Sequence, residues 1–121
     1  MAMIDFDEIA QLLEESFQAE KSNGIDFGVQ IGINDIEDGI WHLQIKNMNC
    51  QVGRGNLISE NTKISVSQAD LLNLLAGQLN PTLAFFTGRI KLSGDQSGIL
   101  KMISLFDFNK EKLDHLLEKY K

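Results

Sequence analysis

The chain has 121 residues, a formal net charge of −6 and one cysteine, and these values exclude several classes of protein. A chain of this length can bury roughly two-thirds of the surface that it exposes when unfolded, so we expect residues 1–121 to form a single domain. Nucleic acid is excluded as the main partner, because phosphate binding requires clustered lysine and arginine and this chain is acidic, with a pI of about 4.8. Cys50 alone forms neither an internal disulfide nor a multi-cysteine metal site.

The same features predict a soluble, cytoplasmic protein. No apolar run approaches the ~18 residues of a transmembrane helix, and the acidic start of the chain lacks the basic residues of a secretory signal. A chain without a disulfide framework is typical of a reducing compartment.

The first predicted element is a one-sided helix near the N-terminus. Its apolar residues, from Phe6 to Phe17, fall within a band of roughly 100°, and acidic or amide side chains occupy the remainder. Lys21–Gly24 follows as a stop signal, with Gly24 in the position that accepts a left-handed backbone.

Four strands are predicted next. Residues 25–33 alternate strictly between apolar and polar, and the turn Glu37–Gly39 leads to a second strand in which Trp41, Leu43 and Ile45 face inward. A short strand is expected around residues 50–54, and a fourth around residues 62–66. One face of this sheet is therefore core and the other is polar.

Two central helices carry more apolar surface than packing on one sheet requires. The first follows Ser67, which occupies an N-cap position with Asp70 three residues later, and its apolar residues spread over roughly 200°. The second, from about Gln96 to Phe106, keeps only a narrow polar strip. Such helices are either buried on several sides in a filled core, or they line an apolar cavity of the usual ligand size, ~300–1,000 Å³.

The remaining elements complete an α+β fold. Asn80-Pro81 begins a short helix that ends at Phe86, Ile90 and Leu92 face inward on a fifth strand, and a one-sided helix occupies residues 109–121. We therefore predict a five-stranded, mainly antiparallel sheet with helices covering one face.

The sequence contains no convincing catalytic or metal-binding arrangement. His42 and His115 fall on outward positions, and the carboxylates concentrate in turns and on the surface. Motifs such as Gly-x-Ser-x-Gly, His-Glu-x-x-His and Cys-x-x-Cys are missing from the sequence. We expect no catalytic residues, no metal and no cofactor, so the protein is not expected to be an enzyme.

Several motifs of the central region resemble those of one family. Lys63–Ser67, Asp70-Leu71, Ala84-Phe85 and the run Gly88–Asp95 are similar to the sterol carrier protein type-two (non-specific lipid-transfer) domain family. The resemblance covers roughly residues 24–106. It implies a five-stranded sheet, helices on one face, and a hydrophobic tunnel for fatty acyl chains, sterols or isoprenoids.

The resemblance also implies a set of ligand-binding residues, with Trp41 on the floor formed by the sheet. Burial of each methylene contributes about 0.8 kcal/mol, so a long acyl chain binds without a polar anchor. We therefore expect broad specificity. The helix at residues 109–121 is the expected gate, because its narrow apolar stripe and charged opposite face predict the least buried of the helices. The expected wall consists of Trp41, Leu71, Leu75, Leu79, Phe85, Phe86, Ile90, Leu92, Ile99, Leu100, Ile103 and Phe106.

Two functions remain open from the sequence. The first is a soluble lipid-binding or lipid-transfer protein that makes transient contact with membranes. The second is a non-catalytic accessory or dimerisation module that presents a lipid-like substrate to a partner enzyme. The chain ends in Lys119-Tyr120-Lys121 rather than in a Ser-Lys-Leu-type address, which favours the cytoplasm over the peroxisome.

Overall fold

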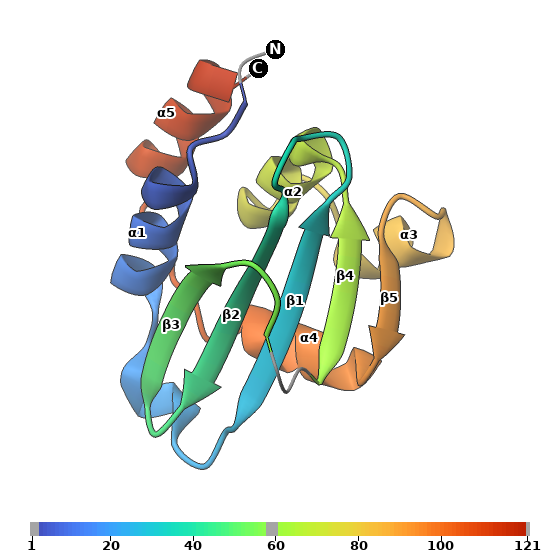
Figure 1. Ribbon diagram of the computed structural model, residues 1–121. Coiled ribbons are helices and arrows are strands. Elements are labelled where there is room, and N and C mark those ends of the chain that lie inside the picture. The colour runs from blue at the N-terminus through green and yellow to red at the C-terminus, as the bar shows by residue number, and fades with distance from the viewer. Residues whose placement is uncertain (1–2, 58–60, 121) are drawn as a thin grey trace.

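The computed structural model describes residues 3–57 and 61–120, and its elements follow the predicted order (Figure 1). The helices are α1 (Phe6–Ser16), the 3-10 helix η1 (Ala19–Ser22), α2 (Gln68–Leu75), α3 (Pro81–Phe86), α4 (Gln96–Ile103) and α5 (Lys110–Tyr120). The strands are β1 (Phe27–Ile33), β2 (Ile40–Lys46), β3 (Asn49–Arg54), β4 (Thr62–Val66) and β5 (Lys91–Gly94).

The five strands form one sheet in the order β3-β2-β1-β4-β5. Three neighbouring pairs are antiparallel and only β1 and β4 run parallel, so the sheet is mixed and mainly antiparallel, as predicted. The parallel pair lies at the centre, where β4 joins β1 after the β1-β2-β3 meander.

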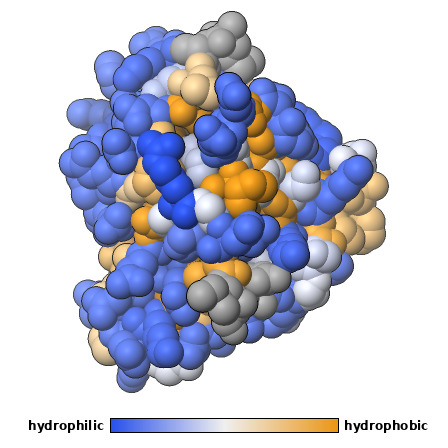
Figure 2. All heavy atoms as spheres, viewed as in Figure 1, coloured by the Kyte–Doolittle hydropathy of each residue, from blue (hydrophilic) through white to orange (hydrophobic). Residues whose placement is uncertain are grey.

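The strand register separates a helix-covered face from an open face. Ile31 of β1 lies opposite Trp41 of β2 and Ile64 of β4, and these apolar side chains share the covered face. Figure 1 shows α2 and α4 behind the sheet. The open face includes Gln30 and Lys63, and Figure 2 shows that the surface on this side is largely hydrophilic, with apolar areas between. The predicted coverage of one face by helices is confirmed.

The first helix ends earlier than its stop signal predicts. α1 ends at Ser16, whereas the Lys21–Gly24 signal instead ends η1, with Gly24 at φ +82°. Phe17 adopts an extended conformation and forms an isolated β-bridge with Phe106. The backbone groups that would continue the helix are therefore used in a long-range contact, which periodicity does not reveal.

The second central helix also ends early, for the same reason. α4 ends at Ile103 rather than at Phe106, and the Leu105 carbonyl accepts a 2.8 Å hydrogen bond from the Gln18 amide. Aromatic contacts accompany this bridge, with the rings of Phe17 and Phe106 5.7 Å apart. The segment after α4 is thereby held beside the segment after α1.

Side-chain caps begin the three helices that surround the central region. The Ser67 hydroxyl accepts from the Asp70 amide at 3.1 Å, and the Asn80 side chain accepts from the Thr82 amide at 2.9 Å, as predicted from the sequence. Asp95 caps α4 in the same way. Donation from the Ser97 hydroxyl, and secondly from the Gly98 amide, lowers the pKa of the Asp95 carboxyl.

We expect Gly98→Ala to destabilise the fold, although this change usually favours a helix by about 1 kcal/mol. A Cβ atom built at Gly98 would overlap the ring of Phe27, which is itself buried in the core. Overpacking of this kind costs about 1–3 kcal/mol, so the free energy of unfolding should fall. Urea denaturation measures this change, and Lys101→Ala, at an exposed position on the same helix, should be nearly neutral. Equal stability of the two variants would contradict the close contact between α4 and β1.

Candidate functional site

An apolar cavity of about 100 Å³ lies between the covered face of the sheet and the helices α1, α2, α3 and α4. All of the residues that line it are apolar. They are Ile9, Leu13, Ile31, Trp41, Leu43, Ile64, Val66, Leu71, Leu74, Leu75, Pro81, Ile90, Ile99, Met102, Ile103, Phe106 and Phe108. The lining therefore favours apolar ligands over water.

The structure brings seven of the twelve predicted site residues together around this cavity. Trp41 and Ile90 contribute from the sheet side, and the other five come from α2, α4 and the segment after α4. The seven residues are Trp41, Leu71, Leu75, Ile90, Ile99, Ile103 and Phe106.

The other five predicted residues lie outside the cavity lining. Leu79 and Phe85 pack against a small apolar cluster formed by Val66, Ala84 and Ile90. Leu92 packs against this cluster and also against the main core. Phe86 and Leu100 are exposed. The apolar surface of α3 and α4 is thus divided between the cavity, the core and solvent.

Sequence reasoning missed ten of the lining residues. Most belong to β1, β2, β4 and α1, where alternation or helical periodicity identified them as core-facing but not as cavity-lining. The missed residues are Ile9, Leu13, Ile31, Leu43, Ile64, Val66, Leu74, Pro81, Met102 and Phe108.

The cavity is smaller than the ~300–1,000 Å³ expected of a ligand site. Large side chains from both layers fill most of the space between sheet and helices. Trp41, Phe106 and Phe108 are among these side chains, together with leucines of α2. The described residues therefore enclose a compact cavity in place of the expected full-sized one.

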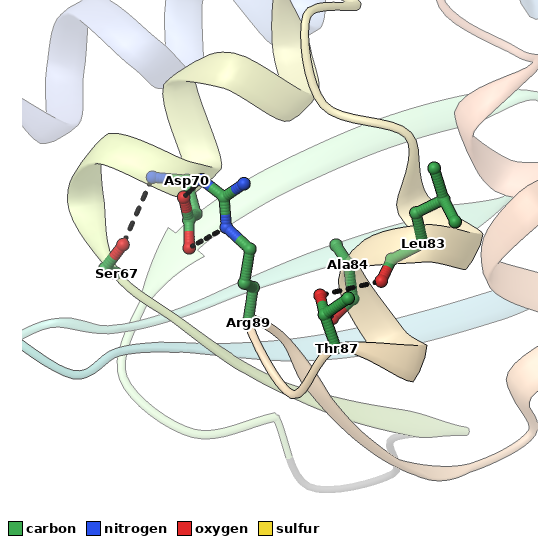
Figure 3. A network of polar contacts seen from close by, with 6 residues as sticks. All are labelled: Ser67, Asp70, Leu83, Ala84, Thr87 and Arg89. Carbon is green, nitrogen blue, oxygen red and sulfur yellow. Dashed lines mark hydrogen bonds and ion pairs between the residues drawn. The ribbon is translucent and has the colours of Figure 1, made fainter.

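An ion pair positions two parts of the cavity wall. Arg89, just before β5, donates to Asp70 of α2 through Nη2 at 2.5 Å and Nε at 3.4 Å (Figure 3). Leu71 follows Asp70 and Ile90 follows Arg89, and both line the cavity. The Asp70 side chain is largely shielded from solvent, so the pair fixes α2 against the turn between α3 and β5.

A second hollow, of about 400 Å³, lies between α1 and α5 and has a different character. Charged side chains line much of it, including Glu8, Glu15 and Lys112. Lys112 donates to Glu15 at 2.8 Å and Lys119 donates to Glu8 at 2.7 Å, so ion pairs bridge the two helices. An apolar ligand would leave these charges poorly hydrated, which makes the smaller apolar cavity the candidate site.

The titratable side chains suggest no reaction centre. His42 lies on the open face of the sheet, with Nδ1 3.0 Å from the Gly55 carbonyl oxygen, and His115 is exposed on α5. Within residues 3–57 and 61–120, no group of three or more histidine, cysteine, aspartate or glutamate side chains is arranged to hold a metal ion. In the same part of the chain, no helix is long and apolar enough to span a membrane.

Cys50 should react slowly with alkylating reagents. Burial, and secondly the charge of Glu14, raise the pKa of its thiol to about 12. At pH 8.5 iodoacetamide should therefore modify the native protein at least about a hundredfold more slowly than the urea-unfolded protein, because the thiolate is the nucleophile. A native rate equal to the unfolded rate would contradict the burial of this side chain.

The same raised pKa predicts a loss of stability at alkaline pH. The neutral thiol is favoured in the folded state, so its contribution is fully present below the unfolded pKa of about 8.5 and is lost as pH rises towards 12. Above about pH 8.5, the free energy of unfolding of Cys50→Ala should therefore fall less steeply with pH than that of the wild type.

The comparison with known proteins agrees with this geometry. Residues 6–107 match the SCP-2 sterol transfer family. Sterol carrier protein 2 of Rattus norvegicus is 32% identical over 112 residues, which cover 86% of this chain and 19% of that protein. Hydroxysteroid dehydrogenase-like protein 2 of Xenopus laevis is 28% identical over 107 residues, which cover 88% of this chain and 26% of that protein.

A solved structure shows the same fold within a larger protein. The inverting sec-alkylsulfatase Pisa1 from Pseudomonas sp. matches with a TM-score of 0.81 at 20% identity, over 88% of this chain and 17% of that one. The chain thus spans about a quarter or less of the length of each of these three proteins. The family match covers most of the chain, and the predicted sheet and covering helices are both present. The chain therefore belongs to the SCP-2 sterol transfer family.

Proposed function

We propose that this chain, acting as a single domain over residues 1–121, is a non-catalytic lipid carrier that holds fatty acyl, sterol or isoprenoid groups in its apolar cavity. The observation that carries the proposal is the lining, in which every residue is apolar. Each methylene transferred from water to such a site contributes about 0.8 kcal/mol, so chain length supplies the affinity. With no polar group to fix an orientation, the carrier has broad specificity.

Seven predicted residues contact the ligand directly in this proposal. Trp41 forms the floor, and Leu71, Leu75, Ile99 and Ile103 form the facing wall between α2 and α4. Ile90 and Phe106 complete this set. Leu79, Phe85, Phe86, Leu92 and Leu100 lie outside this lining, and in the proposal they support or border the wall.

The cavity widens when a long chain enters, because 100 Å³ holds only a short segment of it. Ile103 lines the cavity and is 39% exposed, so it marks the rim. Among residues 110–120 of α5, the expected gate, none lines the cavity, and Lys121 lies outside the described residues. Ion pairs join α5 to α1, so the proposed opening lies at the rim beside α4.

Extraction of the natively purified protein tests this function directly. Mass spectrometry of the extract should reveal a co-purified lipid in stoichiometric amount, and the delipidated protein should take up a fluorescent fatty acid. Delipidated, folded protein that takes up no acyl or sterol probe would contradict the carrier function.

A second candidate is an accessory module that presents a lipid-like substrate to a partner enzyme or forms a homodimer. It is favoured by the coverage of the relatives, in which a matching region forms 17–26% of a longer protein. Affinity purification from the native cytoplasm, followed by sedimentation analysis, separates the two functions. Co-purification of an enzyme in stoichiometric amount favours the module, whereas a lipid-loaded monomer favours the carrier.

A further inference from the structure

We infer that the cavity admits flexible single chains, such as fatty acyl and isoprenoid chains, and discriminates against the rigid fused rings of a sterol. The inference rests on the proposed carrier function and narrows its ligand class. It assigns selection by width to the aromatic part of the lining, defined here as Trp41, Phe106 and Phe108. The carrier stays broadly specific for the length and the polar end of the chain, because the lining residues are apolar.

Side chains outside the cavity hold Trp41 in place. Trp41 is 3% exposed, and its ring forms an edge-to-face pair with the ring of Phe6, with centroids 5.1 Å apart. The guanidinium group of Arg54 lies 4.5 Å from the centroid of the Phe6 ring. Phe6 and Arg54 are not part of the lining. A ligand that displaced the indole would therefore also disturb this supporting pair.

Main-chain hydrogen bonds fix the position of Phe106. On one side of it, the Leu105 carbonyl accepts from the Gln18 amide at 2.8 Å, and on the other side the Asp107 amide donates to the Ser16 carbonyl at 2.9 Å. Both bonds join the segment after α4 to the end of α1 or the residues that follow it. Movement of the Phe106 backbone away from the cavity would break these long-range bonds.

The rings of Phe106 and Phe108 also support each other. They are stacked, with centroids 5.8 Å apart and planes within 7° of parallel. The ring of Phe17, which is not part of the lining, lies 5.7 Å from that of Phe106. Rings packed in this way resist a bulky ligand, because overpacking forces side chains off their preferred rotamers. The aromatic part therefore limits the width of the cavity.

The aliphatic part of the lining yields more easily. Leu74 and Leu75 of α2 are only partly buried, and Ile103 of α4 is 39% exposed. Met102 is unbranched, and such a side chain adapts to irregular shapes. A flexible chain can therefore extend from the cavity of about 100 Å³ by displacing these side chains one after another. A fused ring system needs the sheet and the helices to separate over its whole width at once.

Uptake of two fluorescent probes by the delipidated protein tests the selection. The probes are cis-parinaric acid, a straight-chain fatty acid, and dehydroergosterol, a sterol, each added below the concentration at which it aggregates. The wild type should bind dehydroergosterol at least roughly tenfold more weakly than parinaric acid, because the sterol overpacks the aromatic part of the lining.

Truncation of Phe108 should relax the selection. Phe108→Ala should strengthen sterol binding at least roughly tenfold and leave fatty acid binding within about threefold of the wild-type value. Phe85→Ala is the matched control, since it removes another partly buried ring that is not part of the lining, and it should leave the ratio of the two affinities unchanged. Phe108→Leu, a milder truncation, should shift the ratio in the same direction if Phe108→Ala does not fold. An unchanged ratio in a folded Phe108 variant would overturn the assignment.

Phe17→Ala tests the support from outside the cavity. Loss of this ring should loosen Phe106 and raise the affinity for the sterol relative to that for the fatty acid by roughly threefold or more. A purely structural loss would weaken the binding of both probes alike, so the ratio identifies Phe17 as a positioning residue. An unchanged ratio would overturn this role.

The two probes also separate this inference from the carrier function. Wild-type protein that binds both probes equally well, or the sterol more tightly, overturns the selection by width and leaves the carrier function standing. Uptake of neither probe overturns the carrier function itself.

Discussion

Leu75→Trp is expected to lower the affinity for a fluorescent long-chain fatty acid roughly 100-fold without unfolding the domain. Leu75 ends α2, lines the cavity and is only partly buried, so an indole can enter the cavity from the rim. A space of about 100 Å³ holds roughly four methylene groups. At about 0.8 kcal/mol for each, their exclusion costs about 3 kcal/mol of binding free energy.

The same substitution should leave the melting temperature unchanged or raise it, because filling a cavity adds apolar contacts. Fluorescence titration and thermal unfolding measure the two effects on one sample. Leu83→Trp is the matched control, since Leu83 is exposed on α3 outside the cavity and its replacement should alter neither quantity. Wild-type affinity in a folded Leu75→Trp protein would place the ligand elsewhere.

Leu43→Ala and Ile45→Ala are expected to destabilise the free protein similarly, by about 2–5 kcal/mol, but to respond differently to ligand. Both side chains are buried on the covered face of β2, and only Leu43 lines the cavity. Truncation of Leu43 therefore enlarges the cavity, whereas truncation of Ile45 leaves a void beside it.

A ligand that binds only the folded state stabilises it by about 2.7 kcal/mol at a concentration one hundred times its Kd. Palmitate should consequently raise the melting temperature of Leu43→Ala more than that of the wild type, and raise that of Ile45→Ala no more than the wild type. Thermal unfolding with and without palmitate gives the comparison. Identical increases of the melting temperature in the two variants would show that the acyl chain of palmitate does not bind in the cavity beneath β2.

Local patterns predicted most of the fold. The alternation of residues 25–33 and 41–45 fixed which side chains of β1 and β2 face the helices, and the caps at Ser67 and Asn80 marked the starts of α2 and α3. Apolar periodicity did not predict the long-range contacts. The bridge between Phe17 and Phe106 ended α1 and α4 before their apolar periodicity ended.

The site was only partly predictable, because apolar periodicity shows which face of a strand or helix a residue lies on but not where along that face a cavity forms. Ile31 and Ile64 were recognised as inward-facing, yet only their lateral pairing places them together over the cavity. The Phe85-Phe86 pair of the short helix was predicted to belong to the cavity wall. In the structure, Pro81 and Ala84 face inward, and Leu83 and Phe86, on the opposite side of the same short helix, face solvent.

The central claim is that an acyl chain lies between the covered face of the sheet and α2 and α4. Isotope-filtered nuclear Overhauser measurements on the protein with ¹³C-labelled palmitate test it most directly. We expect contacts from the methylene groups of the acyl chain to the methyl groups of Leu43, Ile64 and Ile99, which line the cavity from the sheet and from α4. Contacts confined to the groove between α1 and α5, around Leu12 and Leu116, would contradict it.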